Sequence, residues 1–364
     1  GKLGVACGEG PLELLGTLRQ EEIPIHLTLA DSHALYDESL AGVVSFRSGE
    51  FDVEKMVLLH RKLLGTVLGM TRVEALAVPR PLVSVPEETS VADGLRAMAA
   101  NGVFSVPLTR RGRVVGVVTM LDAVVFTVEL LQGETKALDV LYTTETMASL
   151  LGRSGRTEAW NPVAGADTLL KAFSSFAHGV HHVCVLDPEH RLTGFVTQTD
   201  AVRLFAEHKN LLGPHASRLI LDVGMHRPRA QISAIGGSVA AWQAFQVMHN
   251  RDISAVAVVD REDYFAADIS ANHLEGICYD TFHLLFVSCT SFLEVSKYTR
   301  DYIVIHELAT VSELVDELAA KHAHRAWITS KGGKLLGLIS LTDFLSAVVE
   351  GISGQVITKV EKVA

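Results

Sequence analysis

Apolar residues recur along this chain in a helix–strand–strand–helix pattern that appears four times. Each copy opens with an apolar stripe at helical spacing: Val91, Leu95 and Met98; Leu169, Phe173 and Phe176; a looser stripe from Val239 to Met248; and Val311, Leu314, Val315 and Leu318. A strand-like run follows in each copy, namely SVPLT from Ser105, HVCVLD from His182, SAVAVVD from Ser254 and RAWIT from Arg325. A polar turn, a second strand and a second helix complete the unit, so we predict an α/β (α+β) fold built from four repeats.

A short motif marks the point where the second strand of a copy leads into its second helix. It reads GVVTMLD from Gly116, GFVTQTD from Gly194 and GLISLTD from Gly337. In all three copies, Ser or Thr lies three residues after the Gly, and Asp lies six residues after it. The resulting pairs are Thr119 and Asp122, Thr197 and Asp200, and Ser340 and Asp343.

The third copy breaks this rule when it is aligned on Gly276, where the sequence reads GICYDTF. The Ser or Thr position is then Tyr279, and the Asp position is Phe282. Asp280 comes two positions early, which turns it by about 200° on a helix. The segment DREDYFAADISANHLEG makes the turn between the strands longer than in the other copies. We therefore expect the third copy to lack the acidic residue that the others share.

A unit of this size cannot bury both faces of its small sheet alone, whereas two units packed sheet to sheet can. We predict two such pairs joined head to head, with repeats 1 and 2 in residues 66–212 and repeats 3 and 4 in residues 213–352. The Gly-Pro of NLLGPHASR, which starts at Asn210, predicts a linker between the pairs. Residues 1–65 are expected to form an extension with an amphipathic helix in FDVEKMVLLHRKLLGTVLG, and residues 353–364 a C-terminal tail.

Composition narrows the class of protein. Hydrophobic residues make up 48% of the chain, which indicates an ordered globular protein, and no apolar run is long enough to predict membrane insertion. The net charge of -10 and the dispersed basic residues argue against nucleic-acid binding. Four cysteines without C-x-x-C spacing favour a reducing compartment, so we expect a cytoplasmic location, with the nucleus as an alternative. The chain begins without Met, so we expect it to be truncated or processed, and an organelle-targeting segment stays open.

The junction motif, three times in register behind the same helix and strand, resembles the CBS (cystathionine beta-synthase) repeat. Over about residues 70–350 the four-repeat arrangement is similar to the gamma regulatory subunit of AMP-activated protein kinase, and in particular to its plant branch. The segments that carry the resemblance are HRAWITSKGGKLLGLISLTDFL from His324, GVHHVCVLDPEHRLTGFVTQTD from Gly179 and GVVTMLDAVV from Gly116. The resemblance implies two Bateman modules, each a pair of CBS repeats, that bind adenine nucleotides in clefts between repeats.

The ribose of such a nucleotide needs an acceptor for its two vicinal hydroxyls, and a carboxylate in the first turn of a helix suits that need. The adjacent hydroxyl can reach the sugar or the phosphate. Carried over residue by residue, the resemblance gives these roles to the acids Asp122, Asp200 and Asp343 and to their neighbours Thr119, Thr197 and Ser340.

The phosphates need cationic or imidazole donors, which form strengthened, charge-assisted hydrogen bonds. His324 and Arg325 occupy the positions of the family's phosphate-binding His-Arg pair. His181 and His182 occupy the matching positions in the second repeat, where His182 replaces the Arg, and Phe104 replaces the basic residue of the first repeat. We therefore expect anion binding that is weaker or more pH-dependent than in a full gamma subunit.

The same residues also have structural explanations. A Thr-x-x-Asp sequence before a helix is a cap, and we expect the cap role in all three intact copies, with ligand binding added to it. His324 and Arg325 can instead form a solvated strand end. The histidines around His181 and His324 have no acidic or Cys partner close in sequence, so we predict no metal site.

The resulting hypothesis is a non-catalytic regulatory subunit that senses AMP, ADP or ATP as a regulatory ligand and uses no catalytic cofactor. We predict that it is not an enzyme, because the repeats account for nearly all of the chain. The resemblance implies protein partners, namely the catalytic and beta-type subunits of a protein kinase complex. The alternative is a structural or scaffold CBS protein of a larger assembly with reduced or lost nucleotide binding. The lapse in the third repeat and the missing basic residues favour that alternative.

Overall fold

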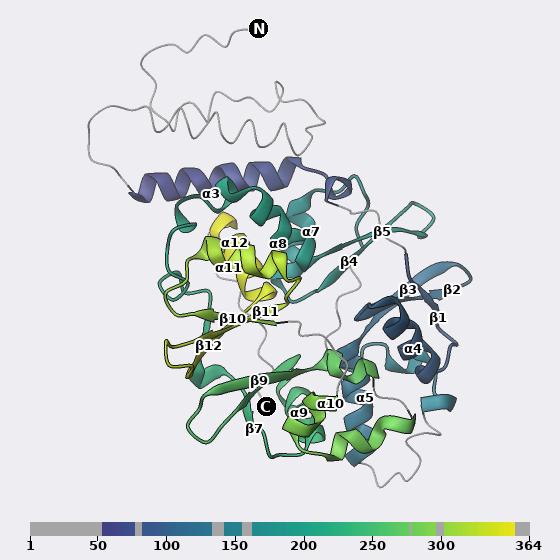
Figure 1. Ribbon diagram of the computed structural model, residues 1–364. Coiled ribbons are helices and arrows are strands. Elements are labelled where there is room, and N and C mark those ends of the chain that lie inside the picture. Colours follow the sequence, from purple (N-terminus) through teal and green to yellow (C-terminus); the bar gives the residue numbers. More distant parts are fainter. Residues whose placement is uncertain are drawn as a thin grey trace, which may run out of the picture.

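The computed structural model describes residues 53–76, 82–132, 142–154, 162–276, 279–295 and 302–353 (Figure 1). Residues 1–52 and 354–364 lie outside this part of the chain, so the C-terminal tail and most of the N-terminal extension stay predictions.

Each repeat contains the predicted helix, two antiparallel strands and a second helical segment. Repeat 1 consists of α4 (Val91–Asn101), β2 (Ser105–Arg110), β3 (Arg113–Thr119) and α5 (Met120–Gln132). Repeat 2 consists of α7 (Leu169–Ala177), β4 (His182–Leu186), β5 (Leu192–Thr197) and α8 (Gln198–Glu207). Repeat 3 consists of α9 (Ala241–Arg251), β8 (Ala255–Val259), β9 (Phe265–Ser270) and the 3₁₀ helix η5 (Ala271–Gly276). Repeat 4 consists of α11 (Val311–Ala320), β11 (Arg325–Thr329), β12 (Leu335–Ser340) and α12 (Leu341–Ser353).

Short elements connect these units. They are η1 (Val73–Ala75), β1 (Val85–Pro86), η2 (Met147–Leu150), η3 (Lys209–His215), β6 (Arg227–Pro228), η4 (Arg229–Gln231), β7 (Ala234–Gly236), η6 (Tyr279–Phe286), α10 (Cys289–Val295) and β10 (Tyr302–His306). Parallel partners extend three of the four hairpins: β1 pairs with β2, β7 with β8, and β10 with β11. Strand β6 adds to the fourth sheet through β12, so the segment before repeat 3 becomes part of repeat 4.

The apolar stripes form the buried faces of the first helices, as predicted. Phe173 and Phe176 on α7 and Leu314 on α11 are fully buried, and so are Val91 and Met98 on α4. Helix starts agree with local chemistry as well. The Ser90 side chain accepts a hydrogen bond from the Asp93 amide, and α11 begins with a complete capping box. Local sequence preference and burial therefore specify the same elements.

Within each half of the chain, the two sheets pack against each other. In the first half, Val114 of β3 is buried with Cys184 and Leu186 of β4, and its amide donates to the His190 carbonyl at 3.4 Å. In the second half, Trp327 and Ala257 share a small core, and the Phe265 amide donates to the Gly333 carbonyl at 3.1 Å. The fold prediction of four repeats in two sheet-packed pairs is confirmed by these contacts.

Across the halves, the helices form two shared layers (Figure 1). Helix α7 packs against α12 and α8 against α11, so repeats 2 and 4 share one large core at the top of the view. Helix α5 packs against α9 and η5, so repeats 1 and 3 share the other core at the opposite end. The sequence did not predict that the first and third repeats share a core. The domain limits 66–212 and 213–352 stay a prediction, because both large cores run across them.

Helix α3 (Val53–Met70) confirms the predicted amphipathic helix and covers repeats 2 and 4, where it contacts α7 and α12. The Gly-Pro segment differs from the predicted linker. It lies in η3, which packs under α3 with Leu211 and Leu212 buried. Gly213 has a φ of +53°, and a Cβ there would lie 2.4 Å from Nδ1 of His60. Only glycine fits this close approach.

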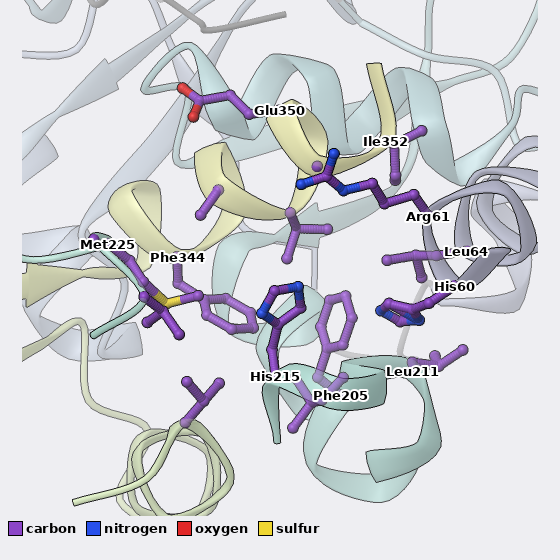
Figure 2. Close-up of a pocket in the computed structure, with 17 residues that line it drawn as sticks. His60, Arg61, Leu64, Phe205, Leu211, His215, Met225, Phe344, Glu350 and Ile352 are labelled. Atoms are coloured by element: carbon purple, nitrogen blue, oxygen red, sulfur yellow. The ribbon is translucent and has the colours of Figure 1, made fainter. Parts of the chain in front are cut away.

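A pocket of about 360 Å³ lies between α3, η3, the segment Val223–Met225 and α12 (Figure 2). His60 and His215 line it, with ring centroids 6.2 Å apart. Burial, His215 and Arg61 together lower the pKa of His60 from 6.5 to about 4. Burial, Arg218 and Arg61 also lower the pKa of His215.

We expect Gly213→Ala to destabilise the protein by about 1–3 kcal/mol, because the added methyl group overpacks the His60 ring at a positive φ. Urea unfolding measures the change. Gly69→Ala on the same side of the molecule is the matched control, because a Cβ at Gly69 meets nothing within 4 Å. The control should be neutral or slightly stabilising. Equal stability of the two variants would contradict the described packing.

We expect acid to destabilise the protein through His60. Its folded pKa of about 4 lies below the unfolded value of 6.5, so the unfolded chain binds the proton more tightly. Stability is therefore complete above about pH 6.5 and falls as the pH drops toward 4, by about 2 kcal/mol at pH 5. Denaturant titrations between about pH 4 and 6.5 should show that the free energy of unfolding of His60→Gln depends less on pH than that of the parent protein. His190→Asn, which removes an exposed imidazole, should keep the parent slope.

Candidate functional site

The three intact junctions are built alike. Each second strand ends at a Ser or Thr whose amide donates to the Oδ2 atom of the Asp three residues later, at 2.9 Å in each of the three repeats. The Asp amide donates back to the hydroxyl at 3.4, 3.1 and 3.1 Å in repeats 1, 2 and 4. These reciprocal bonds satisfy two amides that the helix itself cannot. The predicted cap role is therefore present in all three copies.

The second carboxylate oxygen, Oδ1, has a different donor in each repeat. Asp122 accepts hydrogen bonds from the amide and hydroxyl of Ser154, at 3.0 and 2.8 Å. Asp343 accepts two bonds from the Arg227 guanidinium, both at 3.2 Å. Asp200 accepts one from Arg203 at 3.2 Å. Ser154 comes from the segment that leads into repeat 2, and Arg227 comes from the segment that leads into repeat 3. These two segments therefore reach carboxylate oxygens to which the family resemblance assigns a ribose.

The third junction corrects the sequence alignment. Strand β9 ends at Ser270, which lies opposite Ala255 just as Ser340 lies opposite Arg325 in repeat 4. The residue equivalent to Asp343 is therefore His273, and Tyr279, Asp280 and Phe282 are not at the junction. The turn between β8 and β9 has the same length as that between β11 and β12, so the predicted long turn was wrong.

His273 takes over the capping role of the missing acid. The Ser270 amide donates to its Nδ1 atom at 3.1 Å, and the Ser270 hydroxyl lies 3.1 Å from the same nitrogen. An imidazole nitrogen that accepts an amide proton is unprotonated, so Nε2 carries the proton in this role. The prediction that the third repeat lacks the shared carboxylate agrees with this junction, although the residues that replace the motif are different.

The glycine of the motif explains the misalignment. A Cβ on Gly116 would lie 2.6 Å from a Leu151 methyl group, and one on Gly337 would lie 3.1 Å from the Arg227 carbonyl. The glycine therefore lets an incoming linker cross the second strand closely. Repeat 3 has Ala267 at this position, opposite Val258 as Gly337 is opposite Ile328. The motif glycine is therefore needed where another segment crosses the strand closely, and it does not take part in the helix cap.

The residues predicted to bind phosphate occupy equivalent places in their repeats. The carbonyl of His324 accepts from the first amide of α12 at 3.1 Å, and the carbonyl of His181 accepts from the first amide of α8 at 3.1 Å. The Phe104 carbonyl does the same for α5 at 3.0 Å. The rings of Phe104 and His324 meet edge to face with centroids 5.9 Å apart, so the first and fourth repeats meet here. The centroids of the His181 and His182 rings lie 6.4 Å apart.

Arg325 is buried, which overturns the alternative of a solvated strand end for this residue. Its guanidinium donates to Oδ2 of Asp268 on β9 at 3.0 Å, and the Trp327 indole donates to the same oxygen at 3.0 Å. The side chains of Arg325 and Asp268 are 6% and 0% exposed. Sequence reasoning missed Asp268, and an acid inside an otherwise apolar strand was the available signal. The phosphate role of Arg325 stays a prediction.

The pocket between α3 and α12 is separate from these junctions, because none of the ten predicted site residues lines it. Within the described ranges, no group of three or more His, Cys, Asp or Glu side chains is placed to hold a metal ion. No helix in the same ranges has the length and apolar character needed to cross a membrane. Cys184 and Cys289 are buried free thiols.

Comparison with known proteins agrees with the repeat structure. The family model of the CBS domain matches residues 73–128, 162–207 and 295–350, which contain the three junctions with an Asp. Protein SDS23 of Yarrowia lipolytica is 24% identical over 332 residues, and the match covers 76% of this chain and 65% of that protein. The SNF1-related protein kinase regulatory subunit gamma-like PV42b of Arabidopsis thaliana is 23% identical over 332 residues, covering 74% of this chain and 91% of that protein.

Among solved structures, a Methanocaldococcus jannaschii protein described as a proposed archaeal homologue of g-AMPK aligns with a TM-score of 0.63 at 15% identity. The alignment covers 75% of this chain and 98% of that one, and at this identity it shows the fold alone. We conclude that the chain contains CBS-domain repeats at the three matched segments, that it has the CBS fold, and that its sequence is similar to SNF1-related gamma-like regulatory subunits.

Proposed function

We propose that the chain is a non-catalytic regulatory protein that binds AMP, ADP or ATP through its CBS repeats. The observation that carries the proposal is the threefold recurrence of a buried carboxylate beside a Ser or Thr hydroxyl at the start of a second helix. The names of two relatives, which are called gamma-like regulatory subunits of an SNF1-related protein kinase, support action within a protein kinase complex. We propose that catalytic and beta-type subunits are the partners in this complex. The cytoplasm is the compartment that we propose for this complex.

In repeat 4, Arg227 could release Asp343 and bind the phosphate of a nucleotide instead. Its guanidinium pairs with Asp343, and the Arg227 side chain as a whole is 34% exposed, so Arg227 lies at the edge of the site. A ribose that bonds to the Asp343 carboxylate would displace this guanidinium. The released Arg227 would then be close enough to pair with a phosphate of the same ligand, a charge-assisted bond that offsets the lost ion pair. Repeat 4 is therefore our leading candidate for nucleotide binding.

A scaffold function is the second candidate, and specific contacts favour it. Ser154 satisfies the outer oxygen of Asp122 with two hydrogen bonds, and Arg325 is held by Asp268. His273 replaces the third acid, and Phe104 replaces a basic residue. A chain with these contacts could keep the CBS fold and present it to partner proteins without a nucleotide.

We expect calorimetric titration with AMP, ADP and ATP to show submillimolar binding of at least one nucleotide. Asp343→Ala should weaken that binding by about 1–3 kcal/mol, the usual cost of leaving buried polar groups unsatisfied. Because Asp343 also caps α12, the variant must first be shown to be folded. Glu313→Ala is the matched control, since it removes a capping carboxylate from α11, away from the junctions.

The titration distinguishes a nucleotide sensor from a scaffold protein. Absence of binding by all three nucleotides supports the scaffold. Nucleotide binding that persists unchanged in folded Asp343→Ala removes the ribose assignment from repeat 4.

We expect Asp268→Asn to destabilise the protein by about 3–5 kcal/mol, because it removes the buried carboxylate that pairs with the buried Arg325 charge. Urea unfolding measures the loss. Glu317→Gln, which breaks the exposed pair with Lys321, should cost less than about 1 kcal/mol. An effect of Asp268→Asn as small as that of Glu317→Gln would contradict a stabilising role for this buried ion pair.

A further inference from the structure

The pocket between α3, η3 and α12 has a lining that divides into an apolar part and a basic part. Its apolar walls come from side chains such as Leu64, Phe205, Leu211, Phe344 and Val348. These side chains belong to α3, η3 and the helices of repeats 2 and 4, so the pocket exists only where the extension packs on the repeats. Its volume of about 360 Å³ lies in the range of small-molecule sites.

The basic part consists of His60, Arg61 and His215 (Figure 2). In Figure 2 the Arg61 side chain extends from α3 over the pocket, and Phe205 and Phe344 are drawn on either side of the His215 ring. The Nδ1 atom of His215 is buried and has no hydrogen-bond partner within the described ranges. Glu350 is the acidic residue of the lining, and its carboxylate points away from both imidazoles toward the edge.

We propose that this pocket binds a small organic anion with an apolar body, whose carboxylate is held by Arg61, His60 and His215. The apolar walls match the body of such a ligand, and the three basic groups match its head. A guanidinium binds a carboxylate with two parallel hydrogen bonds, and each imidazole supplies one further donor. The inference does not rest on the proposed function, because the pocket contains none of the junction residues.

Proton uptake should accompany binding. The charged and titratable groups that face the two imidazoles are Arg61 on α3, Arg218 after η3 and the other imidazole, whereas the Glu350 carboxylate on α12 points away from both (Figure 2). Burial is the main cause that lowers the pKa of both histidines, and the neighbouring basic groups lower it further. A bound carboxylate places a negative charge beside these rings and raises their pKa, so the complex holds more protons than the free protein near neutral pH. Binding is then tighter at lower pH.

We choose octanoate as the test ligand for this pocket, and octan-1-ol as the control, because it has the same number of carbon atoms and no charge. In calorimetric titrations of the full chain we expect octanoate to bind at least about tenfold more tightly than octan-1-ol, and more tightly at about pH 6 than at about pH 8. Titrations in buffers of different ionisation heat should show net proton uptake. Arg61→Met should weaken octanoate binding about tenfold. Lys62→Met, which removes an exposed neighbouring charge outside the pocket, should leave it unchanged.

Several results overturn the proposal. They are equal binding of octanoate and octan-1-ol, octanoate binding that Arg61→Met leaves unchanged, and no octanoate binding up to about 10 mM. Val348→Trp, which fills the pocket, should abolish octanoate binding in folded protein, and persistent binding would also overturn the proposal. Asp343→Ala should leave octanoate binding intact, so failure of the nucleotide hypothesis and failure of this one are distinguishable.

Discussion

The structure depends on an exchange of hydrogen bonds at the residue where each second strand becomes a helix. A hydroxyl accepts from the amide three residues on, and the side chain at that position accepts from the last amide of the strand. Both amides lie at the boundary between sheet and helix, where water is largely excluded and an unsatisfied donor would be costly. Because four residues complete the exchange, the helix can start directly from the strand and pack against the neighbouring repeat.

The third repeat shows what this exchange requires. His273 has no negative charge, yet its Nδ1 atom accepts the Ser270 amide as the Asp oxygens do elsewhere. The fold therefore needs an acceptor at this position and does not require the negative charge that the other three repeats carry there. Ser154, Arg203 and Arg227 donate hydrogen bonds to the second carboxylate oxygen in these three repeats. Any ligand at these acids must replace a donor that the chain itself supplies.

The sequence predicted the local parts of this structure well, because apolar spacing and capping pairs act over a few residues. Helices α4, α7 and α11 and their strands followed directly from it. Contacts that depend on distant residues could not be predicted. The pairing of Asp268 with Arg325, the fit of Gly213 against His60 and the shared core of repeats 1 and 3 all join segments far apart in the chain. The incorrect alignment of repeat 3 on Gly276 has the same origin, because the motif glycine is required only where a distant segment crosses the strand.

Helix α12 places the two proposed ligand sites on one rigid element. Asp343 lies in its first turn, where Arg227 on β6 holds it, and Val348 and Ile352 near its other end line the basic pocket. A ligand at either end can influence the other only if it prefers one of two arrangements of α12. Such arrangements would have to differ in the packing of α12 on α3 and α7, because that core is continuous and close-packed. The position of the extension helix α3 would therefore change with ligand binding at either site, since α3 contacts α12 and supplies His60 and Arg61.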